Sequence, residues 1–200
     1  MSAAPRIQGV TRPELTMPEA EAAVLRRAYE RAECILEYGS GGSTVLASEL
    51  PGKRVVSVES DPDWCAMMRD WFAANPGRSA VEMVHADIGP TREWGHPQDE
   101  ARWRRFPAYP LKVWDSGIAP DVVLVDGRFR VGCALATAFR TQKPVTVLFD
   151  DYGDRKPYHR VEEFLGTPEM TGRLAQFEVS PRSVPQDRLL RVIELICAPL

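Results

Sequence analysis

The sequence lacks the features that mark secreted and membrane-spanning proteins. No apolar run is long enough to cross a bilayer, and the N-terminal stretch MSAAPRIQGVTRPEL has no apolar core of the kind found in signal peptides. The four cysteines lie far apart and form no CxxC pair, which favours buried free thiols in a reducing compartment. We therefore expect a cytoplasmic protein with no membrane partner.

Strong charge and signs of covalent catalysis are also missing. The formal net charge is −3, which gives no general attraction to nucleic acid. No serine has a convincing His/Asp set, so a hydrolase that works through a covalent intermediate is disfavoured. The 200 residues contain no internal repeat and suffice for one buried core but are few for two. We predict a single domain over residues 1–200 and no nucleic-acid partner; a homo-oligomer stays open.

Strand and helix patterns alternate along the chain. Residues 1–32 form an N-terminal segment in which Thr16 and Glu19 make a capping-box pattern before a helix that runs to about Ala32. Short apolar strands then alternate with helices that end at Pro-Gly pairs or polar turns. The predicted strands are CILEYG (34–39), KRVVSVES (53–60), AVEMVHAD (80–87), PDVVLVDG (120–127), PVTVLFDD (144–151), LAQFEVS (174–180) and LLRVIELIC (189–197). This alternation predicts an α/β fold, a doubly wound, mostly parallel seven-stranded sheet with helices on both faces and an antiparallel last strand.

One stretch, residues 89–119, interrupts this alternation. Long irregular connections in compact domains are usually lids or binding loops, so we expect a substrate lid here. Trp94 and Trp103 offer flat apolar faces and Arg105 offers paired donors, which makes them candidate substrate-binding residues. Arg128, just after the fourth strand, is a further candidate that would steer an anionic substrate. The alternative is that DEARWRRF is only an amphipathic turn with a solvated basic face.

The turn EYGSGGST follows the first strand and is a candidate ligand-binding loop. Glycines at 39, 41 and 42 let a ligand approach the backbone, and sheets of this kind bind ligands at the carboxyl ends of their strands. Glu59 lies 20 residues after Gly39, where an acid would hold ribose hydroxyls. Thr44 stands where the dehydrogenase pattern GxGxxG has its third glycine, which argues against a pyrophosphate ligand. An NAD-dependent or nucleotide-sugar enzyme remains an alternative.

Five motifs in order resemble those of class I S-adenosylmethionine-dependent methyltransferases. EYGSGGS is similar to the first motif, VVSVESD to the second, HADIG to the third, PDVVLVDG to the fourth and VTVLFDDY to the motif on strand five. VDGRFRVGCALA and EWGHP also resemble a bacterial branch of that family related to plant polysaccharide methyltransferases. The resemblance implies a Rossmann-like methyltransferase fold and S-adenosylmethionine as the cofactor.

The resemblance also implies roles for single residues. Those expected to bind the cofactor are Glu37, Gly39, Ser40, Gly41 and Gly42 around its methionine part, Glu59 at its ribose, and Asp87 and Ile88 at its adenine. Asp126 would lie beside the sulfonium as the candidate catalytic residue. The implied reaction is O-methylation of a small-molecule or saccharide hydroxyl. An inactive cofactor-binding module or a partner subunit remains the alternative.

A metal site is a further expectation. Asp126, Asp150 and Asp151 end two strands that should be neighbours, and catechol-type O-methyltransferases hold a divalent metal with acids and an amide at those strand ends. Three clustered carboxylates suit Mg²⁺ or Mn²⁺, which would lower the pKa of the acceptor hydroxyl. The alternative is that Arg128 or Arg155 pairs with these acids, or that Asp151 caps the next turn.

Overall fold

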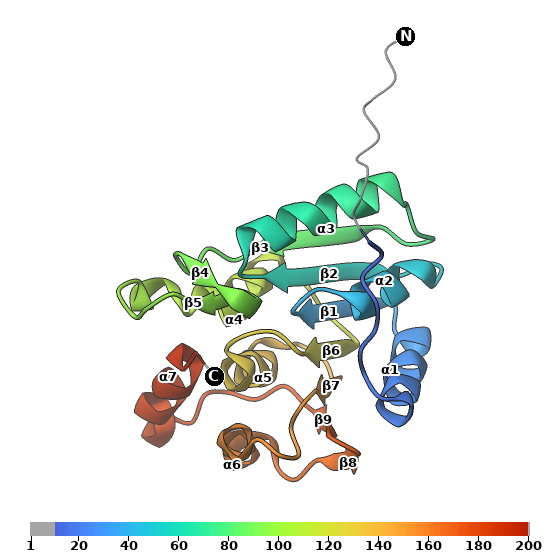
Figure 1. Ribbon diagram of the computed structural model, residues 1–200. Helices are drawn as coiled ribbons and strands as arrows, with labels where there is room; N and C mark the ends of the chain where they lie inside the picture. The colour runs from blue at the N-terminus through green and yellow to red at the C-terminus, as the bar shows by residue number, and fades with distance from the viewer. Residues whose placement is uncertain (1–10, 200) are drawn as a thin grey trace.

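The computed structural model describes residues 11–199 and is built on one seven-stranded sheet. Its strand order is β3-β2-β1-β6-β7-β9-β8 (Figure 1). The five parallel strands are β1 (Cys34–Tyr38), β2 (Arg54–Glu59), β3 (Val81–His85), β6 (Val122–Val125) and β7 (Val145–Phe149). The strand β9 (Leu174–Val179) runs antiparallel to β7, and β8 (Glu169–Thr171) is antiparallel to β9. The predicted fold class is confirmed.

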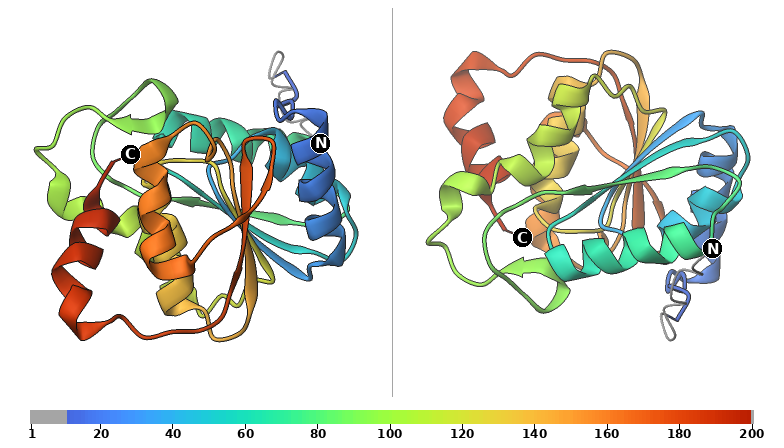
Figure 2. Two further views of the ribbon diagram at one scale, coloured as in Figure 1. Left: turned by 90° about the horizontal axis from the view of Figure 1, so that it is seen from below. Right: turned by 90° about the horizontal axis from the view of Figure 1, so that it is seen from above.

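Helices cover both faces of this sheet (Figure 2). One face carries α1 (Glu19–Arg31), α2 (Gly42–Glu49) and α3 (Pro62–Ala74). The other carries α4 (Ala108–Leu111), α5 (Arg130–Arg140), α6 (Glu162–Leu165) and α7 (Leu189–Cys197), with the short 3-10 helices η4 (Lys156–Val161) and η5 (Gln186–Arg188) leading into the last two. The four residues of β6 are all buried, as expected for a continuous apolar strand with helices on both sides. No helix between residues 11 and 199 is both long and apolar enough to span a membrane.

Two local predictions were wrong. The segment LLRVIELIC forms helix α7 rather than a strand, because Val192 and Leu195 are buried at helical spacing while Leu190 is 71% exposed. The strand β8 pairs instead with the outer edge of β9. A two-residue turn that begins at Gly172, whose φ is +54°, joins these two strands. The helix α1 begins at Glu19 with Pro18 as its N-cap and no side-chain cap, so the expected capping box is not formed.

Residues 89–119, called the insert from here on, fall into two halves. The outer half holds the hairpin β4 (Thr91–Arg92) and β5 (His96–Pro97), and the 3-10 helices η1 (Glu93–Gly95) and η2 (Trp103–Arg105). The inner half holds α4 and η3 (Lys112–Ser116), and it packs on the sheet beside α5. Phe106, Tyr109 and Trp114 are buried there, so the inner half takes the place of the helix that normally joins two parallel strands.

Candidate functional site

The glycine turn between β1 and α2 lies at the carboxyl edge of the sheet, and its three glycines have different reasons to be glycine. Gly39 has a φ of +96°, and a Cβ there would lie 2.7 Å from the backbone of Gly127. A Cβ on Gly42 would lie 2.2 Å from the backbone between Glu14 and Leu15. A Cβ on Gly41 would meet nothing within 4 Å. Of these three glycines, Gly41 alone therefore faces open space.

Glu37 lies beneath this turn and is fully buried. One of its oxygens accepts a hydrogen bond from the Tyr29 hydroxyl at 2.6 Å, and the other accepts from the Thr44 hydroxyl. Thr44 Oγ1 in turn accepts from the backbone N–H of Gly41 at 3.0 Å. Burial raises the pKa of Glu37, and the hydrogen bonds from Thr44 and Tyr29 oppose that rise. Glu37 thus fixes the shape of the turn from below.

Glu59 ends β2 and ties that strand to the glycine turn. Its Oε1 accepts from the N–H of Ser60 at 2.7 Å and from the N–H of Asp61 at 3.0 Å. Its Oε2 accepts two longer bonds from Ser40, 3.2 Å from the hydroxyl and 3.4 Å from the N–H. The weaker pair on Oε2 leaves that oxygen open to competition by stronger donors such as ribose hydroxyls.

Asp87 and Ile88 follow β3, where the sequence predicts an adenine site. Ile88 is buried, whereas Asp87 is exposed and accepts from the Gly89 N–H at 2.9 Å. Asp87 also forms a 2.6 Å ion pair with Arg105 from the insert. The Gly89 hydrogen bond is the main cause of the lowered pKa of Asp87, and Arg105 adds to it. Arg105, predicted to bind substrate, is therefore paired with a residue predicted to bind cofactor.

The aromatic side chains of the insert divide between its two halves. Trp94 is 80% exposed and Trp103 is 51% exposed, so neither belongs to the core. Tyr109 is fully buried, and its hydroxyl donates to the carbonyl of Val58 at 3.4 Å. A Cβ on Gly127 would lie 2.1 Å from that hydroxyl oxygen. The inner half of the insert is therefore held against the ends of β2 and β6.

Arg128 lies directly after this contact, on the turn that leads into α5. Its backbone N–H donates to the Tyr109 hydroxyl at 3.3 Å, and its guanidinium lies 2.6 Å from Nε2 of His96. Burial, followed by the charge of Arg128, lowers the pKa of His96, so the imidazole is neutral near pH 7 and accepts the hydrogen bond. Arg128 is thus attached to the insert and not to the carboxylates predicted as its alternative partners.

Asp126, Asp150 and Asp151 come together at the ends of β6 and β7, with one oxygen of each within 4.8 Å of the others. Burial is the main cause of a rise in the pKa of Asp126 to about 6, and the other two acids add to it. Arg130, which is 4% exposed, opposes this rise from 3.1 Å away. Asp151 has a φ of +56°, so the turn after β7 is strained at this cluster.

The contacts of the cluster decide how well it suits a metal. Three carboxylates are suitable oxygen ligands for Mg²⁺ or Mn²⁺. However, both oxygens of Asp150 accept from Arg173 at 3.2 Å, and both oxygens of Asp151 lie within 3.4 Å of arginines. Arg155, one of the two arginines named as alternatives, pairs with Asp151 at 2.9 Å. These contacts favour neutralisation by arginine, and the metal stays a prediction.

Several residues of this edge were not predicted from the sequence. Arg130 donates to the backbone carbonyls of Gly127, Asp126 and Asp150, and so joins the turns after β6 and β7. Arg130 begins α5 only four residues after Asp126, so its closeness in the chain was an available signal. Arg173 lies 23 residues beyond Asp150 on the β8–β9 turn, and no local spacing indicates that pair.

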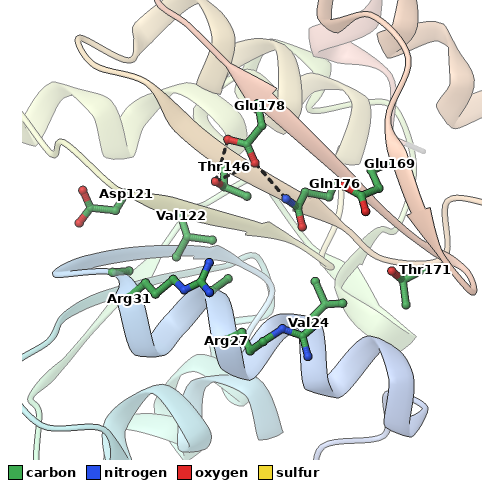
Figure 3. Close-up of a pocket in the computed structure, with 12 residues that line it drawn as sticks. Val24, Arg27, Arg31, Asp121, Val122, Thr146, Glu169, Thr171, Gln176 and Glu178 are labelled. Atoms are coloured by element: carbon green, nitrogen blue, oxygen red, sulfur yellow. Dashed lines mark hydrogen bonds between the residues drawn. The ribbon is translucent and has the colours of Figure 1, made fainter.

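A cavity on another part of the sheet lies away from this edge. It has a volume of about 360 Å³ and is situated between α1 and the sheet (Figure 3). Arg27 and Arg31 of α1 lie on one side of it, and Gln176 and Glu178 of β9 on the other. Glu178 accepts hydrogen bonds from Thr146 and Gln176. None of the predicted site residues lines this cavity, so we place the candidate site at the carboxyl edge.

Comparison with known proteins finds a near relative and distant structural neighbours. No family model matches the chain, and no curated protein matches it. The chain is 61% identical to a methyltransferase-like protein (spo2022) from Silicibacter pomeroyi, with a TM-score of 0.90 over 94% of this chain and 99% of that one. It shares the fold, at 17% identity, with the O-methyltransferase TomG from Streptomyces achromogenes (TM-score 0.54, 84% and 82% of the chains) and with cofactor-bound Rv0187 from MTB (TM-score 0.56, 85% and 84%).

Proposed function

The chain belongs to the class I S-adenosylmethionine-dependent methyltransferases, and from this premise we propose that it methylates a hydroxyl group of a small molecule or saccharide. One observation carries the proposal. Asp126, a carboxylate with a pKa of about 6, stands at the end of β6 while the adjoining Gly127 touches Gly39 of the glycine turn. A proton acceptor and a candidate cofactor loop are therefore in contact across neighbouring strands.

We assign cofactor binding to the residues of the turn and the two following strand ends. The backbone around Ser40 and Gly41 would hold the methionine part, because Gly41 faces open space. Oε2 of Glu59 would exchange its long bonds from Ser40 for the ribose hydroxyls. Asp87 would accept from the adenine amine at its exposed carboxylate, in competition with Arg105. When bound, S-adenosylmethionine supplies a methyl group that its positive sulfur activates.

The chain's own part in the reaction is alignment and proton removal. Asp126 would hold the acceptor hydroxyl, and the glycine turn would hold the cofactor whose methyl group that hydroxyl receives. A carboxylate oxygen of Asp126 would take the hydroxyl proton. A pKa near 6 leaves Asp126 mostly ionised at neutral pH while keeping it basic enough to take the proton. The pairs with arginine balance the charge of Asp150 and Asp151 without a metal ion.

A ligand panel tests this assignment against the NAD and nucleotide-sugar alternatives. We expect S-adenosylmethionine and S-adenosylhomocysteine to raise the melting temperature, and NAD, NADP and UDP-glucose to leave it unchanged. A ligand at a hundredfold over its dissociation constant stabilises the native state by about 2.7 kcal/mol. Transfer of labelled methyl to a panel of hydroxyl compounds then separates an enzyme from an inactive module. If the parent and Asp126→Asn both bind S-adenosylmethionine but neither transfers its methyl group to any compound or extract, that result would argue for the inactive cofactor-binding module.

A further inference from the structure

Arg128 is a charged side chain whose hydrogen-bonding groups are not all used. It is half-buried on the turn after β6, and its Nε is buried without a hydrogen-bond partner among residues 11–199. Its one side-chain partner in that range is the imidazole of His96. A buried donor without a partner costs free energy that a bound acceptor would recover.

The charge of Arg128 is also not balanced by an ion pair. Within the described part of the chain, no carboxylate lies within 4 Å of it, and the nearby acids are engaged by other arginines. Burial, and then the charge of Arg130, lowers the pKa of the Arg128 guanidinium. A half-buried cation whose partner is a neutral imidazole is in an unfavourable environment. The guanidinium therefore favours an anion that the chain does not itself supply.

The position of this cation relates it to the proposed reaction. Arg128 and Asp126 are two residues apart on one turn, separated by Gly127, which contacts the glycine turn. A guanidinium binds carboxylate and phosphate through two parallel hydrogen bonds, so it fixes the orientation of its ligand as well as its position. A group bound at Arg128 would thus orient a hydroxyl of the same molecule toward Asp126.

We propose that Arg128 is a specificity-determining residue that binds an oxyanion, a carboxylate or a phosphate, carried by the methyl acceptor. The anion binds the side of the guanidinium that His96 does not occupy, beside the buried Nε–H, and His96 holds the guanidinium from the insert side. The inference rests on the proposed function for its link to methyl transfer. The anion site itself can be tested without any methyl acceptor.

The experiment uses inorganic phosphate and acetate as probes, at constant ionic strength so that screening does not change. Each is titrated calorimetrically into the full chain, with and without saturating S-adenosylhomocysteine. We expect Arg128→Gln to weaken binding about tenfold or more, because a charge-assisted pair of hydrogen bonds is lost. Arg104→Gln is the matched control, since Arg104 is an exposed arginine of the insert that stacks on Trp103. It should change the affinity less than about twofold.

A spectroscopic measurement on the parent protein covers the case in which Arg128→Gln does not fold. The ¹⁵Nε–H resonance of Arg128, assigned by its loss in Arg128→Lys, should shift on titration with phosphate or acetate. A shift with either probe supports the site, and the stronger probe identifies the preferred oxyanion. If neither probe shifts it, or if Arg104→Gln loses as much affinity as Arg128→Gln, the inference is overturned. Failure of S-adenosylhomocysteine to bind while phosphate binds would count against the proposed function and leave the anion site standing.

Discussion

Glu59→Gln is the substitution that tests the cofactor assignment most directly. The amide keeps one oxygen, which can still accept from the N–H groups of Ser60 and Asp61 at the end of β2. The other oxygen, which now accepts only the long bonds from Ser40, becomes an NH₂ group. A ribose hydroxyl that donates to that oxygen loses its acceptor, while the N–H groups of Ser60 and Asp61 keep theirs.

The magnitude follows from the kind of hydrogen bond that is lost. Hydrogen bonds to charged groups contribute about 1.5–3 kcal/mol. At about 1.4 kcal/mol per factor of ten, the dissociation constant of S-adenosylhomocysteine should rise roughly 10- to 140-fold. Because the bonds from Ser60 and Asp61 remain and only the two long bonds from Ser40 are lost, we expect the melting temperature without ligand to fall by only a few degrees at most, which is about the effect of 1 kcal/mol or less.

Isothermal titration calorimetry of the parent and the variant gives the required comparison. Glu49→Gln is the matched control, since Glu49 ends α2 and its ion pair with Arg12 is exposed. It should bind S-adenosylhomocysteine as the parent does. If Glu59→Gln binds with unchanged affinity, the assignment of Glu59 to the ribose is wrong, and its hydrogen bonds to the turn are its whole role.

Three further predictions concern the ends of β6 and β7. The pKa of Asp126 is raised to about 6, so the folded state holds a proton more tightly than the unfolded state between about pH 4 and 6. The free energy of unfolding should therefore lose a contribution as pH rises through that range, and urea titrations of Asp126→Asn should lack that slope. Chelator-treated protein should bind S-adenosylhomocysteine normally. Calorimetric titration with Mg²⁺ or Mn²⁺ should show no heat of binding, because Arg173 occupies both oxygens of Asp150. Metal binding that Asp150→Asn abolishes would contradict this. Gly127→Ala should destabilise the fold by about 1–3 kcal/mol because its Cβ would lie 2.1 Å from the Tyr109 hydroxyl, and a melting curve of the double variant with Tyr109→Phe should recover part of that loss.

The alternation of strands and helices and the glycine turn were within reach of the sequence because both depend on local pattern. Val122 to Val125 form a continuous buried run, and parallel strands bring their carboxyl ends to one edge. The helix α7 was not, because LLRVIELIC is mostly apolar apart from Arg191 and Glu194, and its length allows either structure. Leu190 and Ile193 are exposed in the structure, but as apolar residues they give the segment the composition of a buried strand.

The sequence predicted where the candidate site residues lie along the strands, but not which side chains form ion pairs with them. Spacing from the glycines placed Glu59 at the end of one strand, and the fourth motif placed Asp126 at the end of another, as the structure has them. The ion pairs of Asp87 with Arg105 and of Asp150 with Arg173 depend on how the insert and the β8–β9 turn fold back on the sheet. Such pairs join segments 18 and 23 residues apart, and several arginines were equally available at the sequence level.

If the insert binds the methyl acceptor, as the sequence predicts, its division into a buried inner half and a mostly exposed outer half limits how the acceptor range can be changed by protein engineering. Phe106, Tyr109 and Trp114 belong to the same core as α5, so exchanging the whole insert between relatives would also remove part of the sheet's covering. Trp94 and Trp103 stand on the outer half, with most or half of their surface in solvent. Libraries confined to exposed residues of the outer half, such as Trp94 and Trp103, would therefore vary the predicted acceptor side while the inner half continues to hold the strand ends in place.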